Sequence, residues 1–311
     1  MDSLDVALTM VKMAIPIVIG FVAHKLGYMD EKIDTSISAI ILNVTIPCML
    51  IASAGSVSEA MEVSTVLELL GFSTLAHLIM LVMALVIPKL LRVEKSLQGV
   101  YGFMVMYGNV GLIGYPVIAA IYGDEALVYA AISSIPQSLF VFSIGYVMIS
   151  GQMGSVREVL ASCVKQMLSP TLISSAILLV LVLLGVNDLG VLGDGLELAG
   201  EFTTPAALLV CGSTIARYRP AEVFSNWRAY VIAACRLVLV PVVLLLVLGP
   251  FMTDDLVRGV VVVGLSMPVA NNGLLFCLDC GVDTKPMIQS TVISIIGSIG
   301  SIPLAVMLAA L

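Results

Sequence analysis

The sequence is poor in charged and aromatic residues. Only 11% of its 311 residues are Asp, Glu, Lys or Arg, 6% are aromatic, and 60% are hydrophobic. A soluble domain carries roughly 25% charged residues. So little charge excludes a soluble globular domain of ordinary composition, and it makes the lipid bilayer the expected surroundings and partner of the chain.

Motifs of enzymes and of metal centres are also missing. We find no phosphate-binding P-loop, no metalloprotease motif and no nucleophile elbow, and therefore expect no catalytic residues, no cofactor and no nucleic-acid partner. The six cysteines include one C-x-x-C pair, Cys277 and Cys280, for which a zinc or redox site is the alternative interpretation. No second cysteine pair or nearby histidine completes a ligand set. We therefore interpret the cysteines as packing residues and expect no metal.

Long hydrophobic runs fill almost the whole chain. A membrane-spanning helix needs about 20 apolar residues. Read in this way, the sequence predicts an all-α membrane protein with ten spans, at about 5–26, 33–54, 65–90, 97–122, 125–149, 166–186, 191–215, 227–249, 256–279 and 285–310.

The basic residues predict the orientation of these spans. Eleven of the fourteen Lys and Arg residues lie in alternate loops, which the positive-inside rule assigns to the cytoplasm. The opposite loops hold only Arg258. We therefore predict a multi-pass protein of the cell (cytoplasmic) membrane with both termini extracellular. The net charge of −7 comes largely from the short outer loops.

The chain repeats itself weakly after five spans. Thr45 and Pro47 in the second span are matched by Thr203 and Pro205 in the seventh, an offset of 158 residues. We predict a first five-helix repeat (1–150), a short cytoplasmic linker (151–165) and a second repeat (166–311). Five is an odd number, so the second repeat enters the membrane inverted, as in many secondary transporters. Chance similarity between apolar segments is the alternative.

Helix breakers interrupt the fourth and ninth spans at corresponding places. Asn109 and Pro116 lie in the fourth, and Pro268, Asn271 and Asn272 lie in the ninth. Backbone groups freed at such breaks cannot face lipid, so they line a protein cavity. We expect Pro116 to start one half-helix and an asparagine side chain to cap the other, with both N-termini aimed at bound anions. A packing kink is the alternative for each break.

A few polar residues within spans are further candidates. Glu201, just before the Thr203-Thr204-Pro205 break, is a candidate protonatable group, and Thr204 is a candidate substrate contact. Arg236 either attracts an anion or holds its half of the bundle together by an ion pair. His77 lies at the equivalent depth of the first repeat, as a core histidine or a proton carrier.

The pair of motifs, N-x-G-x-x-G-x-P from Asn109 and P-x-A-N-N from Pro268, resembles that of the auxin efflux carrier family. The chain is similar to its short prokaryotic, malate-permease-like members over its whole length. The resemblance implies a scaffold of spans 1, 2, 6 and 7, a transport domain of spans 3–5 and 8–10, crossing broken helices 4 and 9, elevator-type movement and a homodimer. By motif position, it maps Asn109, Pro116, Pro268 and Asn272 to the crossing, with the register of Asn271 left open.

Function follows from these patterns as a hypothesis. We expect a secondary transporter of small carboxylate organic anions, malate-like or auxin-like. The alternative is a sodium- or proton-coupled symporter of a larger organic anion, following the bile-acid symporters that share the fold of the family. A membrane sensor or membrane-embedded enzyme is a third class, which the missing output domain and missing catalytic side chains disfavour.

Overall fold

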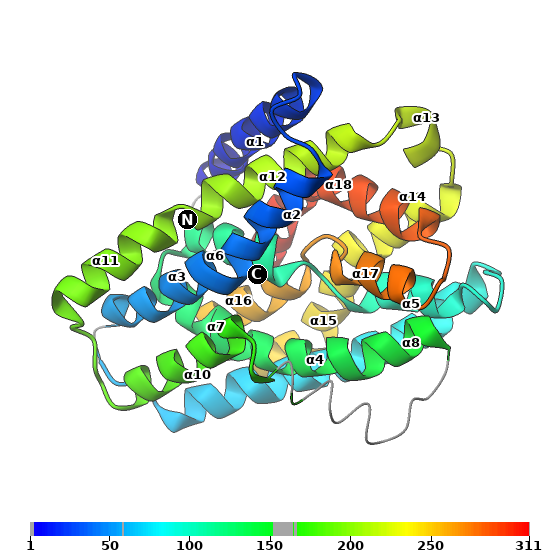
Figure 1. The fold of residues 1–311 in the computed structure, drawn as a ribbon. Helices are drawn as coiled ribbons and strands as arrows, with labels where there is room; N and C mark the ends of the chain where they lie inside the picture. The colour runs from blue at the N-terminus through cyan, green and yellow to red at the C-terminus, as the bar shows by residue number, and fades with distance from the viewer. Residues whose placement is uncertain (1–2, 58, 152–163, 165–166, 311) are drawn as a thin grey trace. The chain divides into compact units, whose positions relative to one another are not determined.

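The computed structural model describes residues 3–57, 59–151, 164 and 167–310. Every regular element in this part of the chain is a helix, and the β pairing found there is one isolated bridge. The prediction of an all-α protein is therefore confirmed. The chain divides into two compact units, each built from three segments, so we describe each unit by itself (Figure 1).

Unit 1 comprises residues 1–71, 111–135 and 168–218. Its helices are α1 (Ser3–Lys25), α2 (Glu31–Ile40), η1 (Ile41–Thr45), α3 (Ile46–Ala52), η2 (Ser53–Ser56), the start of α4 (Val63–Leu90), most of η3 (Val110–Gly114), α6 (Tyr115–Tyr122), most of α7 (Glu125–Phe140), α10 (Pro170–Leu183), α11 (Gly190–Glu201) and α12 (Thr203–Arg217).

Local sequence fixes the helix starts and contacts of unit 1. The side chains of Asp30 and Ser169 accept backbone hydrogen bonds at the N-termini of α2 and α10, as good N-cap residues do. Gly20 and Gly212 let α1 and α12 approach so closely that a Cβ on either would collide with the other helix's backbone. In Figure 1, α3 lies between α10 and α11, and it contacts both.

Unit 2 comprises residues 72–110, 136–167 and 219–311. Besides the remainders of α4 and α7, its helices are α5 (Gln98–Met106), η4 (Val141–Gly145), α8 (Tyr146–Ser150), α13 (Pro220–Val223), α14 (Trp227–Ala234), η5 (Cys235–Leu239), α15 (Val240–Leu248), η6 (Gly249–Phe251), α16 (Asp255–Leu265), α17 (Asn272–Asp279) and α18 (Lys285–Ala309). Its long helix α18 packs against α14, α16 and α5.

Seven helical stretches of the described residues are long and apolar enough to cross a membrane. They match expected spans 1, 2, 3, 5, 7, 8 and 10. The other three expected spans are present as shorter pieces. The fourth is α5 followed by the apolar Val110–Tyr122, the sixth is Pro170–Leu183, and the ninth is α16 followed by α17.

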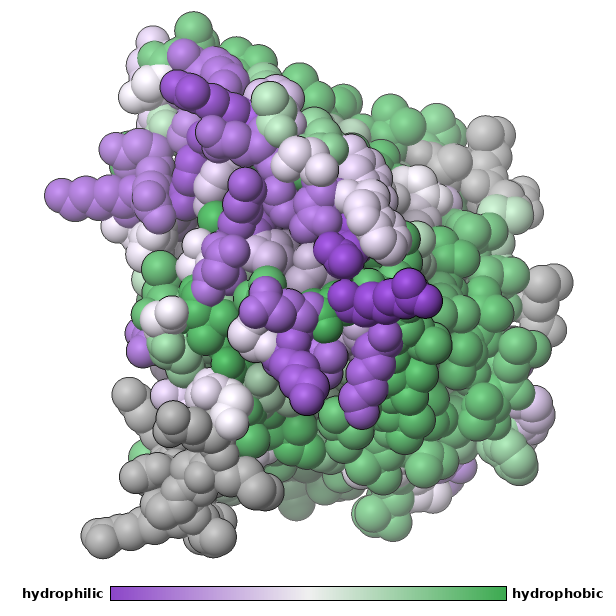
Figure 2. Space-filling model, turned by 90° about the vertical axis from the view of Figure 1, so that its right-hand side faces the viewer, coloured by the Kyte–Doolittle hydropathy of each residue, from purple (hydrophilic) through white to green (hydrophobic). Residues whose placement is uncertain are grey.

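Apolar side chains cover much of the protein surface. Along α1, Leu8, Val11, Ile15 and Val18 are all at least half exposed and recur at helical spacing. Figure 2 shows hydrophobic residues spread widely over one face, with hydrophilic residues gathered beside them. Exposed apolar surface on this scale marks contact with lipid or partners rather than with water.

The compact units do not follow the expected sequence halves, since each unit takes segments from both. The expected linker, 151–165, lies almost entirely outside the described residues. The expected spans are distributed over the units in another way than over the sequence halves. Spans 1, 2, 6 and 7 lie in unit 1, and spans 8, 9 and 10 lie in unit 2.

Candidate functional site: the paired breaks and an acidic pocket

Two helices of unit 2 end inside their apolar runs, and the residues that follow pair with each other. Helix α5 ends at Met106 and α16 at Leu265. Gly108 and Val269 form an antiparallel bridge. The backbone N–H of Asn109 donates to the Pro268 carbonyl at 2.7 Å, and that of Ala270 donates to the Tyr107 carbonyl at 3.1 Å. We call residues 107–110 and 266–271 the paired breaks. They satisfy part of each other's backbone, as buried polar groups require.

Arg236 is fully buried behind the paired breaks, on the π-helical turn η5. Its Nε donates to the Met267 carbonyl at 3.0 Å. Its Nη1 lies 3.2 Å from both the Val105 and the Met106 carbonyl oxygens and 3.3 Å from the sulfur of Met80. No carboxylate of the described residues lies within salt-bridge distance of the guanidinium. Its partners are therefore backbone carbonyls.

Two further polar side chains are buried beside Arg236. Gln137 donates from Nε2 to the Gly108 carbonyl at 2.9 Å. The ring of His77 stacks on Phe140, and its Nδ1 lies 2.7 Å from the Ser73 carbonyl. Both Gln137 and Arg236 are close enough to His77 to interact with it. His77 is thus a hydrogen-bonded core residue of unit 2 within this polar cluster.

Asn109 and Asn271 lie within the paired breaks, and Asn272 directly follows them. Asn109 is buried, whereas Asn271 and Asn272 are half-buried. Helix α17 begins at Asn272, as expected, but the predicted asparagine cap is wrong. Asn271 stands at the N-cap position and makes no side-chain cap hydrogen bond. Its φ of −65° and ψ of −23° are helical, whereas a capping residue is typically extended.

Pro116 belongs to unit 1. It is the second residue of α6, but the helical run containing it already starts with the π turn at Val110. The expectation that Pro116 starts this half-helix therefore holds for its α-helical part alone. Glu201 and Thr204 also belong to unit 1, so the sequence candidates divide between the two units.

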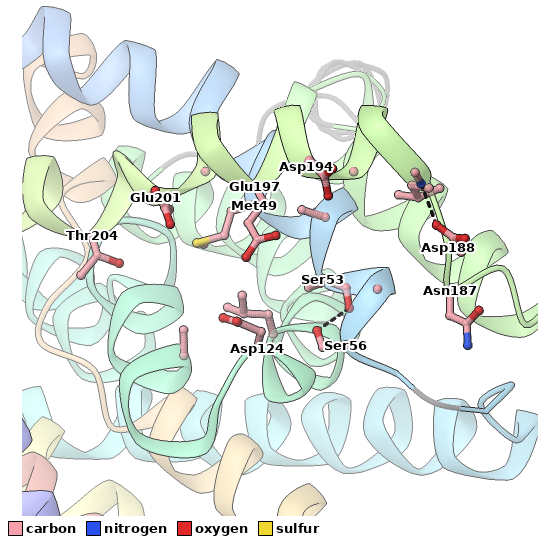
Figure 3. Close-up of a pocket in the computed structure, with 18 residues that line it drawn as sticks. Met49, Ser53, Ser56, Asp124, Asn187, Asp188, Asp194, Glu197, Glu201 and Thr204 are labelled. Carbon is pink, nitrogen blue, oxygen red and sulfur yellow. Dashed lines mark hydrogen bonds between the residues drawn. The ribbon is translucent and has the colours of Figure 1, made fainter.

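Glu201 and Thr204 line a pocket of about 580 Å³ in unit 1 (Figure 3). Asp194, Glu197 and Glu201 recur three and four residues apart on α11, which places them on one helix face. Asp124 and Asp188 complete five carboxylates around the cavity, and none of the described lining residues is basic. Met49 of α3 and Ser53 of η2 lie opposite α11. Such a pocket attracts cations and repels anions.

A direct contact joins two threonines that the sequence repeat equates. The Thr203 hydroxyl donates to the Thr45 hydroxyl at 2.8 Å, and both residues are buried in unit 1. The two residues are 158 positions apart, which is the offset found in the sequence.

Some polar residues were not predicted from the sequence. Gln137 was not singled out because its side chain is uncharged. Its position directly after Pro136, within an apolar run, could have indicated a buried polar residue. Asp34 is buried in unit 1, where its Oδ2 accepts from Arg217 at 2.6 Å and from Ser213 at 2.7 Å. Its place within the expected second span was a similar signal.

A comparison with protein families identifies the chain. The family described as Membrane transport protein, that of the auxin efflux carriers, matches residues 5–306. The chain belongs to the auxin efflux carrier family. Among curated proteins, no sequence matches it.

Membership establishes the general activity. The protein is a multi-pass membrane transporter, which acts in a lipid bilayer on a transported substrate, and it is not an enzyme. The resemblance seen in the motifs around Asn109 and Pro268 is confirmed.

Proposed function

We propose that this transporter of the auxin efflux carrier family moves small carboxylate organic anions, malate-like or auxin-like, across the cytoplasmic membrane. The observation that carries the proposal is the character of the paired breaks. They contain no carboxylate, they lie against the buried cation Arg236, and they lead into the N-terminus of α17. The first N–H groups of a helix have no acceptor within it and carry partial positive charge.

The substrate carboxylate would be bound by the asparagine amides and the first turn of α17. Asn271 and Asn272 are half-buried, so their amides are accessible, and Asn109 and Pro268 hold the backbone pairing beside them. Pro116, by family position, and Thr204, by its place at the Thr203-Thr204-Pro205 break, stay candidate substrate contacts of unit 1. The acidic pocket of unit 1 is unsuited to an anion, which favours the paired breaks as the binding place.

The architecture we propose is two inverted five-helix repeats, 1–150 and 166–311, with helices 4 and 9 broken and crossing. The Thr45–Thr203 hydrogen bond supports the repeat, because equivalent residues meet where a pseudo-two-fold axis passes. We further propose elevator-type movement of spans 3–5 and 8–10 on a dimeric scaffold of spans 1, 2, 6 and 7. The gathering of spans 1, 2, 6 and 7 in one compact unit supports the scaffold, whereas the second part of span 4 and the first part of span 5, which we assign to the transport domain, also lie in that unit.

The orientation, with both termini extracellular, has a direct test. Cysteines placed at Ser3 and at Ser155 should show opposite accessibility to an impermeant thiol reagent added outside cells. Equal labelling of both sites would contradict an inverted repeat of five spans.

A second candidate function is a proton-coupled symporter of a larger organic anion. The observation that favours coupling is the acidic pocket, in which Glu201 is one of five carboxylates able to take up a proton. In this reading, Glu201 is the coupling group, and His77 and Arg236 support the transport unit.

Uptake into proteoliposomes tests both candidates. Purified protein should accumulate labelled malate, or another small organic acid from a panel, over protein-free vesicles. A panel of amines of similar size provides the control. Uptake of amines instead of acids would overturn the anion proposal, and dependence on an imposed pH gradient would favour the symporter.

A further inference from the structure

Arg236 is unusual for a buried charged side chain, because all the groups to which it donates hydrogen bonds are uncharged. Three carbonyl oxygens, those of Val105, Met106 and Met267, lie 3.0–3.2 Å from Nε and Nη1, the Met80 sulfur lies 3.3 Å from Nη1, and Nη2 has no hydrogen-bond partner among the described residues. Val105 and Met106 are the last residues of α5, so their carbonyls lie at the negative end of that helix. Met267 follows the end of α16, in the unwound segment.

Such oxygens are typical cation ligands. In transporters with discontinuous helices, unwound backbone carbonyls and the C-terminal ends of half-helices coordinate the coupling sodium ion. In this protein, oxygens of the same kinds accept hydrogen bonds from the Arg236 guanidinium rather than coordinating a sodium ion. An arginine is always charged at physiological pH, so this occupant cannot leave by losing its proton.

The guanidinium is also too enclosed to meet a transported anion. A Cβ added at Gly108 would collide with the Arg236 Nη2 and would lie 3.0 Å from the Met267 carbonyl oxygen. The Nη2 atom of the guanidinium therefore packs against the Gly108 backbone. Gln137 holds the carbonyl of the same glycine.

We propose that Arg236 is a resident cation, which permanently fills a carbonyl-lined cation site beside the paired breaks, so that no sodium ion is needed there. The guanidinium joins the ends of the two broken helices, as a bound ion would, and keeps them paired through the whole transport cycle. This inference deepens the proposed function, because it assigns the coupling at the same site.

Thermal unfolding tests the proposal without knowledge of the substrate. Purified parent protein and the Arg236→Ala variant are each unfolded in sodium chloride and in choline chloride at equal ionic strength. Removing the side chain leaves the carbonyl oxygens for a sodium ion. We expect a lower Tm for Arg236→Ala, which sodium raises by about 2–4 °C, the shift for a site near ten times its Kd. The Tm of the parent should rise by less in sodium than that of Arg236→Ala, because both proteins keep the acidic pocket and only the variant gains a vacant site.

Arg258→Ala is the matched control. It removes another arginine of unit 2, one that binds the Ala309 carbonyl and Asp255. It should respond to sodium as the parent does. Stabilisation of the parent by sodium to the same extent as Arg236→Ala, or no response to sodium in Arg236→Ala, would overturn the proposal.

A charge-preserving variant decides the case if Arg236→Ala does not fold. Arg236→Lys keeps a cation within reach of the same carbonyls. A folded Arg236→Lys protein that responds to sodium as the parent does supports the resident cation, and one that fails to fold or is stabilised by sodium more than the parent overturns it. Because unfolding needs no substrate, a failed uptake experiment would count against the proposed function alone.

Discussion

The paired breaks of unit 2 and the acidic pocket of unit 1 are both polar regions of an apolar chain, but their electrostatics are opposite. Five carboxylates line the pocket, and no described basic residue balances them. The paired breaks hold amides, backbone groups and a buried guanidinium. One region favours cations or protons, and the other favours anions. A transporter with both can separate the handling of its substrate from the handling of its driving ion.

The substitution with the largest expected effect introduces a negative charge at the proposed anion site. Asn272→Asp is nearly isosteric, so packing should survive, but it places a carboxylate at the proposed anion site. Two like charges about 4 Å apart repel by roughly 4 kcal/mol at an effective dielectric of 20, which is about a thousandfold in affinity. Binding of labelled organic acid to purified protein should nearly disappear. Asn272→Ala should cost about 1 kcal/mol, the value of one hydrogen bond.

The matched control makes the same substitution in the other region. Asn187 lines the acidic pocket, and Asn187→Asp adds one more carboxylate there. If the substrate binds at the paired breaks, affinity should change little. A larger loss in Asn187→Asp than in Asn272→Asp would reverse the assignment of the two regions.

A steric change should have the next largest effect. Gly108→Ala inserts a methyl group between the Arg236 guanidinium and the Met267 carbonyl. Overpacking of this kind costs about 1–3 kcal/mol, which should lower the Tm. Gly300→Ala on α18, where no atom lies within 4 Å of the added Cβ, should instead be neutral or stabilising by about 0.5–1 kcal/mol. Equal Tm values for the two variants would show that the guanidinium is not held tightly.

The smallest expected effect concerns Glu201 in the acidic pocket of unit 1. If Glu201 carries a coupling proton, Glu201→Gln should abolish the response of uptake to an imposed pH gradient and leave substrate binding intact. One pH unit supports about tenfold accumulation at a one-to-one ratio, because 1.4 kcal/mol is tenfold. Glu197→Gln, in the same pocket, should keep the response. A Glu201→Gln protein that still concentrates substrate excludes this role.

Helices and helix ends, which depend on side-chain type, could be predicted from the sequence. Contacts made by backbone carbonyl groups could not. Apolar runs predicted the helices, and the breakers around Asn109 and Pro268 predicted where two of them end, because proline and glycine are poor residues for a helix interior. The partners of Arg236 are carbonyl groups, which every residue has, so no sequence pattern identifies them. The asparagine cap was wrong because Asn271 already has helical dihedral angles, which depend on the pairing of its neighbours.

The chain passes between its two compact units at five points, after residues 71, 110, 135, 167 and 218. Three of these points lie within helical elements: at Gly71 in α4, after Val110 in the π turn η3, and before Pro136 in α7. Glycine and proline are the residues at which helices bend. Gly71 and Pro136 are therefore the positions in α4 and α7 at which we expect these helices to bend most readily.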